Sequence, residues 1–156
     1  MMKELLEYRK SLVNRLVSSA NEFRTECLNI HDQRALLEEG GWNVHQVAAH
    51  VRDVDKLVYG LRIRRTAVES NPEFQSFDGD AYMAQHYSPE EPLDQILNSF
   101  VENIAALAQM LRDLPNEAWS RESRHATLGH GFTLQSWVER NLAHIEEHVK
   151  TLKKRK

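Results

Sequence analysis

Two histidines one helical turn apart, His144 and His148, lie in the stretch NLAHIEEHVK near the end of the chain. Residues four apart in an α-helix project from nearly the same side. A third histidine, His50, lies between Val47 and Val54 on the apolar side of another predicted helix. Three neutral imidazole nitrogens with one open coordination position suit a divalent first-row ion such as zinc, nickel or iron(II). His50, His144 and His148 are therefore the predicted metal ligands.

The same histidines have a second interpretation, which the sequence leaves open. An inward histidine is commonly a hydrogen-bonded core residue, and an H-x-x-x-H pair also arises by chance. If the three are ligands, their ring nitrogens converge within roughly 3 to 3.5 Å, since metal–nitrogen bonds are about 2.1 Å long. The other histidines fall in predicted loops or off the apolar stripes and are not expected in the site: His31, His45, His86, His125 and His130.

Two known metal motifs are excluded by what the chain lacks. HIEEH matches the H-x-x-E-H signature of inverted zinc proteases, but that site needs an acidic ligand well downstream, and only eight residues follow His148. A ferritin-like di-iron site needs two Glu-x-x-His pairs, which the inward stripes do not contain. Glu147 projects about 60° from His144 and can reach the site, whereas Glu146 is expected to face solvent. No catalytic residue is identified.

Four amphipathic helices are predicted to position these histidines. The first follows an apolar stripe through Leu5, Leu12, Leu16, Ala20 and Phe23. The second begins after GGWNVHQV, where Asn43 and Gln46 form a capping box, and extends to about residue 69.

The last two helices also have recognisable starts. In SPEE, Ser88 is the predicted N-cap, with Pro89 at the first helical position and Glu91 completing a capping box. This third helix continues to Pro115, and the fourth starts near Thr133. No convincing strand is found. The chain is thus predicted to be all-α, a four-helix bundle whose long connections, 27–42, 70–88 and 115–132, allow crossover topology.

Composition limits the classes of function. A chain of 156 residues with 41% hydrophobic residues predicts one domain, residues 1–156, with a single core. The formal net charge is −3 and no basic stretch is interleaved with aromatics, so no nucleic-acid partner is expected. No apolar window is long enough to span a membrane, and the charged N-terminus is unlike a signal peptide, which predicts a cytoplasmic protein. Cys27, the only cysteine, is interpreted as a packing residue.

Three stretches together resemble the DinB-like (DinB/YfiT-like) metalloenzyme superfamily: GGWNVHQVAAHVRDVD, FDGDAYMAQHYS and FTLQSWVERNLAHIEEHVKTL. The family pattern is a tryptophan, a histidine eight residues later and a closing H-x-x-x-H helix, which correspond here to Trp42, His50, His144 and His148. The likeness covers nearly the whole chain. It implies a metal site formed by these histidines in a bundle of up-down-down-up connectivity.

The resemblance also implies a chemistry. Relatives include enzymes that use low-molecular-weight thiols such as mycothiol or bacillithiol, among them an isomerase and S-transferases. A divalent cation stabilises a thiolate at neutral pH, and the sulfur then attacks a small-molecule electrophile. Arg140, one turn before His144, is the predicted substrate- or cofactor-binding residue, since a guanidinium suits a carboxylate. Asp53 and the loop residues Asp78, Asp80, Tyr82 and His86 are further candidates near the site.

Three hypotheses arise from the sequence. The first is a metal-dependent thiol transferase, isomerase or hydrolase-like enzyme, and the second is a non-enzymatic or stress-related metal-binding bundle. The third is a structural dimer in which the histidines bind nothing. Many relatives form homodimers, and the tryptophan-bearing stretch 115–137 is a candidate apolar contact surface, so a homodimer is expected. The metal, the thiol and the acceptor are not identified by the sequence.

Overall fold

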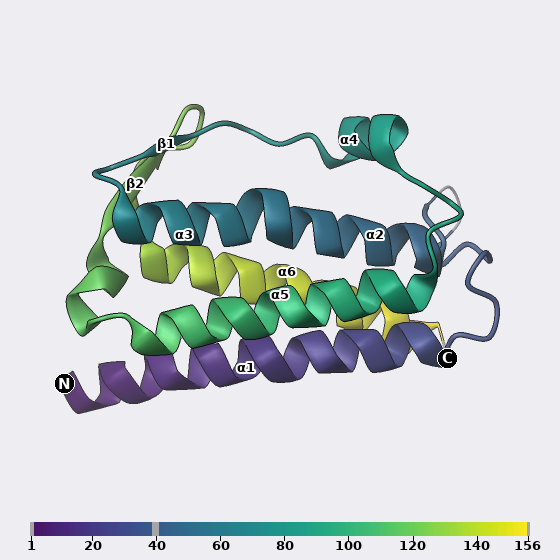
Figure 1. The fold of residues 1–156 in the computed structure, drawn as a ribbon, viewed down its shortest axis with the longest axis horizontal. Helices are drawn as coiled ribbons and strands as arrows, with labels where there is room; N and C mark the ends of the chain where they lie inside the picture. Colours follow the sequence, from purple (N-terminus) through teal and green to yellow (C-terminus); the bar gives the residue numbers. More distant parts are fainter. Residues whose placement is uncertain (1, 39–40, 156) are drawn as a thin grey trace.

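A computed structural model describes residues 2–38 and 41–155; Gly40, in the GGWNVHQV stretch, lies outside them. The described chain is dominated by four long helical segments packed side by side (Figure 1). These are α1 (Met2–Asn29), α2 (Val44–Val54) continuing through the π-helical turn η1 (Asp55–Tyr59) into α3 (Gly60–Val68), α5 (Leu93–Asp113) and α6 (Leu134–Lys154). The prediction of four amphipathic helices is confirmed.

The helices run up, down, down and up, as Figure 1 shows. Helix α1 packs against α5 and α6, while α2 packs against α5 and α3 against α6. Contacts between α1 and α6 recur every seven residues in both helices, from Tyr8–Glu139 through Arg15–Glu146 to Glu22–Lys153, so these two helices are parallel. Segments α2–α3 and α5 are parallel neighbours too, and their connection, residues 69–92, must therefore return along the whole bundle.

The core lies where the four predicted apolar stripes meet. Phe23 of α1 meets Phe100 of α5 edge to face, with ring centroids 5.5 Å apart and both side chains fully buried. Such pairs add to the stabilisation that comes from burying apolar area. Cys27 is fully buried in the same core, which agrees with its interpretation as a packing residue.

Two of the predicted helix starts are confirmed and one is wrong. Asn43 caps α2 with the full capping box to Gln46, and Thr133 caps α6 by accepting a hydrogen bond from the Ser136 N–H. Helix α5 begins at Leu93 with Pro92 at the N-cap, rather than at Ser88. A proline disfavours helical dihedrals in the preceding residue, and Pro92 has no N–H for the helical ladder, so SPEE forms a turn instead.

The expectation of an all-α chain is only partly correct, because the connections contain a small sheet. Strand β1 (Glu73–Phe74) pairs in parallel with β2 (Glu122–His125), and β2 pairs antiparallel with β3 (Gly129–Thr133). The short helices α4 (Gly79–His86) and η2 (Asn116–Ser120) complete the connections. Strands this short contain too few residues to show an alternating pattern, and β1 meets β2 across about fifty residues of chain.

The sheet is attached to the start of α6. The indole N–H of Trp137 donates to the Ser123 hydroxyl at 2.7 Å, and that hydroxyl donates to the Phe132 carbonyl at 2.8 Å. Trp119 and Trp137 are buried, with 4% and 1% of their surfaces exposed. These tryptophans therefore belong to the core of the chain, so a contact surface at 115–137 would have to use other residues of that stretch.

The π-helical turn η1 interrupts the second helical segment without bending it out of the bundle (Figure 1). The Gly60 N–H bonds to the Asp55 carbonyl, five residues back, instead of the usual four. A Cβ atom at Gly60 would lie 2.5 Å from that carbonyl oxygen. Glycine is needed here because only a residue without a side chain permits this approach, and such turns commonly occur at functional sites.

We expect Gly60→Ala to destabilise the protein, although Gly→Ala in an ordinary helix stabilises it by about 0.5 to 1 kcal/mol. The clash with the Asp55 carbonyl forces η1 to rearrange, at a cost of about 2 to 3 kcal/mol. Urea denaturation followed by circular dichroism measures the difference. Leu61→Ala, at an exposed neighbouring position, is the control and should change little. A more stable Gly60→Ala protein would show that the π-helical turn is not a constraint of this fold.

Among the described residues, no helix is long and apolar enough to cross a membrane.

Candidate metal centre

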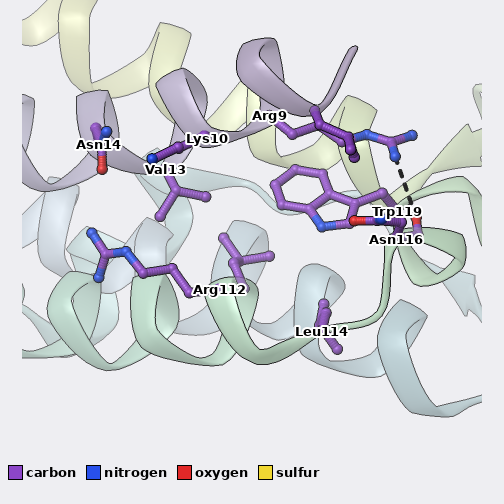
Figure 2. A pocket seen from close by; sticks show the side chains of 10 residues that line it. Arg9, Lys10, Val13, Asn14, Arg112, Leu114, Asn116 and Trp119 are labelled. Carbon is purple, nitrogen blue, oxygen red and sulfur yellow. Dashed lines mark hydrogen bonds between the residues drawn. The ribbon is translucent and has the colours of Figure 1, made fainter. Parts of the chain in front are cut away.

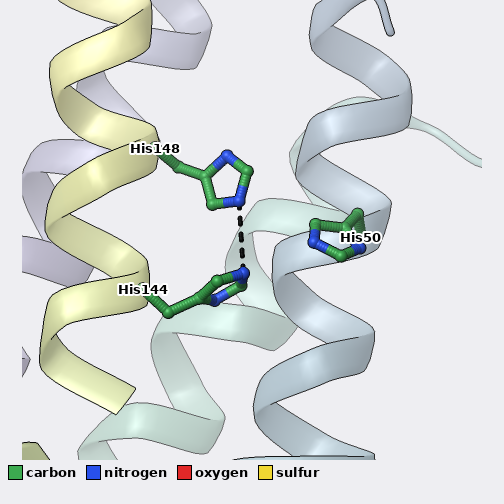
Figure 3. A group of neighbouring side chains, drawn as sticks. All are labelled: His50, His144 and His148. Carbon is green, nitrogen blue, oxygen red and sulfur yellow. Dashed lines mark hydrogen bonds between the residues drawn. The ribbon is translucent and has the colours of Figure 1, made fainter. Parts of the chain in front are cut away.

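His50 projects from α2, and His144 and His148 project from α6, toward a common point (Figure 3). The capping box at Asn43 determines where α2 begins, and His50 lies two turns later. The cap at Thr133 does the same for α6, in which the buried residues Trp137, Leu142 and Ile145 determine the side that faces the bundle. The predicted histidines are thus brought together by helix starts and apolar stripes that the sequence shows.

The three rings are closely spaced. Ring nitrogens of His50, His144 and His148 all lie within 4.8 Å of one another. The Nε2 atoms of His144 and His148 are 3.2 Å apart, within the predicted range of roughly 3 to 3.5 Å. The full set, within 4.8 Å, is wider than that predicted range. Among the described residues, 2–38 and 41–155, these three histidines are the one group of His, Cys, Asp or Glu side chains that could together hold a metal ion.

The surroundings keep the imidazoles neutral. Burial, followed by the neighbouring His148 and His50, lowers the pKa of His144 to about 3. Burial and His50 lower the pKa of His148 to about 4, against a smaller opposing effect of Glu147. Burial also lowers the pKa of His50, which Asp80 partly opposes. Because a histidine binds a metal through a neutral nitrogen, this donor set fits a divalent transition metal.

Aromatic and backbone contacts hold the histidine rings in place. The Trp42 ring lies 4.8 Å from the His50 ring, and the Tyr59 ring lies 5.7 Å from the His144 ring, measured between centroids. Gly79 at the start of α4 lies so close to His50 that a Cβ there would be 3.2 Å from the ring. The residues that flank the rings therefore come from the stretch just before α2, from η1 and from the start of α4.

A buried polar pair lies beside the centre. Asn141, three residues before His144, donates a hydrogen bond of 3.3 Å from Nδ2 to the Asp55 carboxyl in η1. Burial raises the pKa of Asp55 to about 6, while Asn141 and Arg64 oppose the rise. The Asn141 Oδ1 atom is buried and has no hydrogen-bond partner among the described residues. A protonated Asp55 can donate to such an oxygen, which would complete the pair.

Two hollows reach the histidine cluster. One, of about 360 Å³, is lined by His50 and His144 together with Tyr59, Arg62 and Arg140. The second hollow, of about 640 Å³ and more open, is lined by Trp42, His50 and the Ser76–Asp80 segment. The triad is thus accessible to a small molecule from the space beside it.

A separate pocket of about 310 Å³ lies between α1, α5 and η2 (Figure 2). Arg9 there donates to the Gln135 side chain at 2.8 Å and to the Asn116 carbonyl at 3.2 Å, and its guanidinium lies over the Trp119 ring. None of the lining residues is a histidine, cysteine or carboxylate. This pocket therefore lacks the donors that a metal centre needs.

The remaining candidate residues have other partners. Asp53 forms an ion pair of 3.0 Å with Arg52, and Asp78 caps α4. Asp80 lines the open hollow, and the Tyr82 ring stacks on the His86 ring. Glu146 pairs with Arg15 at 2.9 Å on the partly exposed outer side of α6, as its predicted direction requires.

The histidines outside the predicted triad are not part of the converging group. The Nε2 atom of His45, almost fully buried, donates to the Glu91 carbonyl at 2.6 Å, and its Nδ1 lies 2.5 Å from the Tyr87 hydroxyl. His31, His86 and His130 are exposed and are not among the converging donors.

Three residues near the cluster were missed by sequence reasoning: Tyr59, Arg62 and His125. Tyr59 is the last residue of the π-helical turn, and Arg62 comes after it. Because the turn adds one residue to the helical repeat, every later side chain in that segment points in a different direction from that in an ideal helix. His125 lies in β2 and reaches the cluster only through the sheet.

Comparisons with known proteins agree with this architecture. The sequence matches the DinB superfamily over residues 16–152. The structure is similar to that of YfiT from Bacillus subtilis, which is described as a probable metal-dependent hydrolase with an unusual four-helix bundle topology. The TM-score is 0.86 at 19% sequence identity, over 96% of this chain and 86% of YfiT, which is a likeness of fold. No curated protein matches significantly. Because the family match covers most of the chain, the protein belongs to the DinB superfamily.

Proposed function

We propose that the protein is a metal-dependent enzyme that acts on a small molecule, with His50, His144 and His148 as the protein ligands of one divalent ion. The observation that carries this proposal is the cluster of three neutral imidazoles beside an accessible hollow. Three protein ligands leave a coordination position open, as catalytic zinc sites do, whereas structural sites are closed by four. Zinc, nickel and iron(II) all suit imidazole donors.

A bound divalent ion would supply Lewis-acid chemistry, which lowers the pKa of a thiol or of water at neutral pH. We propose that the activated group is a low-molecular-weight thiol and that the reaction is an S-transfer or an isomerisation, following the resemblance to thiol-dependent relatives. A water-dependent hydrolysis is the second candidate, because the structurally similar YfiT is described as a probable metal-dependent hydrolase. A non-catalytic metal-binding role is the alternative to both.

The chain's own residues position the reaction. Trp42 and Tyr59 pack against the rings of His50 and His144, which restricts their rotation. Phe77 lines both hollows and adds an apolar surface beside the rings. Arg140 lines the smaller hollow next to His144, where we propose that it binds an anionic group of the substrate or cofactor.

Elemental analysis of protein purified without a His tag tests the metal. About one equivalent of zinc, nickel or iron is the expected result, and a metal-free protein that also fails to bind added ions would overturn the proposal. Turnover of 1-chloro-2,4-dinitrobenzene with added thiol then tests S-transfer, and turnover of p-nitrophenyl acetate without thiol tests hydrolysis. Stoichiometric metal with neither activity would favour the non-catalytic role.

A homodimer remains a proposal as well. Since Trp119 and Trp137 are buried in the chain, the interface would have to use other residues. The molar mass from light scattering at high protein concentration distinguishes a dimer from a monomer.

A further inference from the structure

The smaller hollow beside the triad has a positively charged wall. Arg62, Arg140 and His125 line it together with His50 and His144. From this arrangement we infer that the hollow binds the carboxylate of a small substrate whose reactive part faces the histidines. The inference rests on the proposed function for the identity of the site, and it adds the chemical class of the substrate.

The two guanidinium groups are gathered around one aromatic ring. The Cζ atom of Arg62 lies 4.8 Å from the centre of the Trp137 ring, and that of Arg140 lies 5.8 Å from it. Arg140 also lies 5.1 Å from the Phe132 ring. These cation–π contacts hold the planar groups in place without using up their N–H donors.

No carboxylate of the described chain neutralises these charges. Neither Arg62 nor Arg140 has an ion pair within residues 2–38 and 41–155, although six other pairs of opposite charge are formed there. Arg62 donates one hydrogen bond, from Nη2 to the Gln75 carbonyl at 2.9 Å, and it is only 8% exposed. Burial lowers the pKa of Arg62, Tyr59 partly opposes this effect, and the nearby positive charge of Arg140 adds to it.

His125 adds a hydrogen-bond donor to this wall. Its Nδ1 atom accepts from the backbone N–H groups of Thr127 and Leu128, both at 3.2 Å, so the neutral ring carries its proton on Nε2. Burial, then Arg62 and Arg140, lowers the pKa of His125 and favours this neutral form. The wall therefore offers two planar cations and one neutral donor without a compensating acceptor, an arrangement that an anion would stabilise.

The open hollow next to His50 has the reverse charge. Asp78 and Asp80 line it, and it shares Ser76, Phe77 and Gly79 with the smaller hollow. An anionic substrate is therefore repelled from the acidic side and attracted to the basic one. A carboxylate suits the planar guanidinium fork, and the apolar side chains of Val54, Val58 and Phe77 would contact the body of the molecule.

Calorimetric titration of chelator-treated protein tests this inference with benzoate, benzamide and phenyl phosphate as probes. We expect benzoate to bind at least about tenfold more tightly than the neutral benzamide of the same shape, and Arg140→Gln to weaken benzoate binding about tenfold or more. Arg65→Gln is the matched control, because Arg65 lies one turn after Arg62 and pairs with Glu69 at 2.7 Å. It should bind benzoate as the parent does. Arg140 is exposed, so its replacement is expected to leave the fold intact.

Equal binding of benzoate and benzamide, or an Arg140→Gln protein that binds benzoate like the parent, would overturn the inference. Tighter binding of phenyl phosphate than of benzoate would overturn the carboxylate assignment in favour of a phosphate. His148→Ala separates this inference from the proposed function, since His148 is a predicted metal ligand but does not line the hollow. That variant should lose metal and keep benzoate binding. Loss of benzoate binding in His148→Ala would count against a hollow that recognises the anion independently of the metal.

Discussion

His148→Ala is expected to lower the affinity for zinc or nickel at least about 100-fold, equivalent to roughly 2.7 kcal/mol. The replacement removes one of three imidazole donors and leaves the other two, which form a much weaker site. Helicity should stay close to that of the parent, because the α6 core comes from buried apolar residues such as Val138, Ile145 and Val149. Metal-to-protein ratio after dialysis, together with a competition titration against a chromophoric chelator, measures the change.

Glu146→Ala is the matched control for this experiment. Glu146 lies on the same helix two residues away, but it faces Arg15 on α1 rather than the cluster. Losing this exposed ion pair costs at most about 1 kcal/mol of stability and no metal affinity. If His148 is only a hydrogen-bonding group of the core, its replacement would reduce the thermal midpoint without changing metal content. Equal metal content in His148→Ala and in the parent would end the assignment of His148 as a ligand.

The metal-free protein is expected to lose stability steeply in mild acid. Unfolded histidines bind protons below about pH 6.5, whereas folded His144 and His148 do so only near pH 3 and pH 4. Between these values the unfolded chain binds more protons than the folded one, so the free energy of unfolding falls as the pH falls. Each such proton contributes about 1.4 kcal/mol per pH unit.

Asp55 has the opposite effect on the free energy of unfolding in the same pH range. Its pKa is about 6 in the folded protein against a usual value of 3.8, so below pH 6 the folded chain binds a proton that the unfolded chain does not. The histidines outnumber Asp55, and His50 acts with them because its pKa is also lowered. The net expectation is a loss of about 1.4 to 2.7 kcal/mol per pH unit between pH 6 and pH 5.

Urea denaturation at pH 7, 6 and 5 after treatment with a chelator measures this dependence. Two variants should change this pH dependence in opposite directions. The free energy of unfolding should fall less steeply with falling pH in His148→Ala and more steeply in Asp55→Asn, each by about 1.4 kcal/mol per pH unit. Asp55→Asn should also be more stable than the parent at pH 7, where the buried carboxylate is ionised at a cost. A parent whose stability does not change between pH 7 and pH 5 would contradict the neutral state of the triad.

Much of the candidate metal centre could be predicted from the sequence because the relevant signals are local. The spacing of His144 and His148 places both rings on one side of any helix. The capping residues Asn43 and Thr133 mark where α2 and α6 begin, and the apolar stripes determine which side of each helix is buried. These three kinds of information predict the convergence of the rings, since a histidine next to a buried stripe has to face the neighbouring helix.

Local signals failed where two of them competed. The SPEE stretch satisfies the pattern of a capping box, but Pro92 comes immediately after it and prevents the helix from starting there. Glu91 is used instead by residues distant in sequence: its carboxylate pairs with Arg52 at 2.6 Å, and its carbonyl accepts from His45. Those partners lie in α2, and only tertiary packing brings them together.

The basic wall of the hollow and the surroundings of the triad were decided by tertiary structure. His125 reaches the site because β2 pairs with β1 across about fifty residues, and such pairing has no signal in strands of two to four residues. Arg62 and Tyr59 reach it because η1 inserts one residue into the helical repeat and rotates the later side chains of that segment. The sequence alone determined the helices, their buried sides and the three histidines, since these depend on contacts within a few residues. The charge and shape of the space beside them depend on contacts between distant segments, which no local pattern encodes.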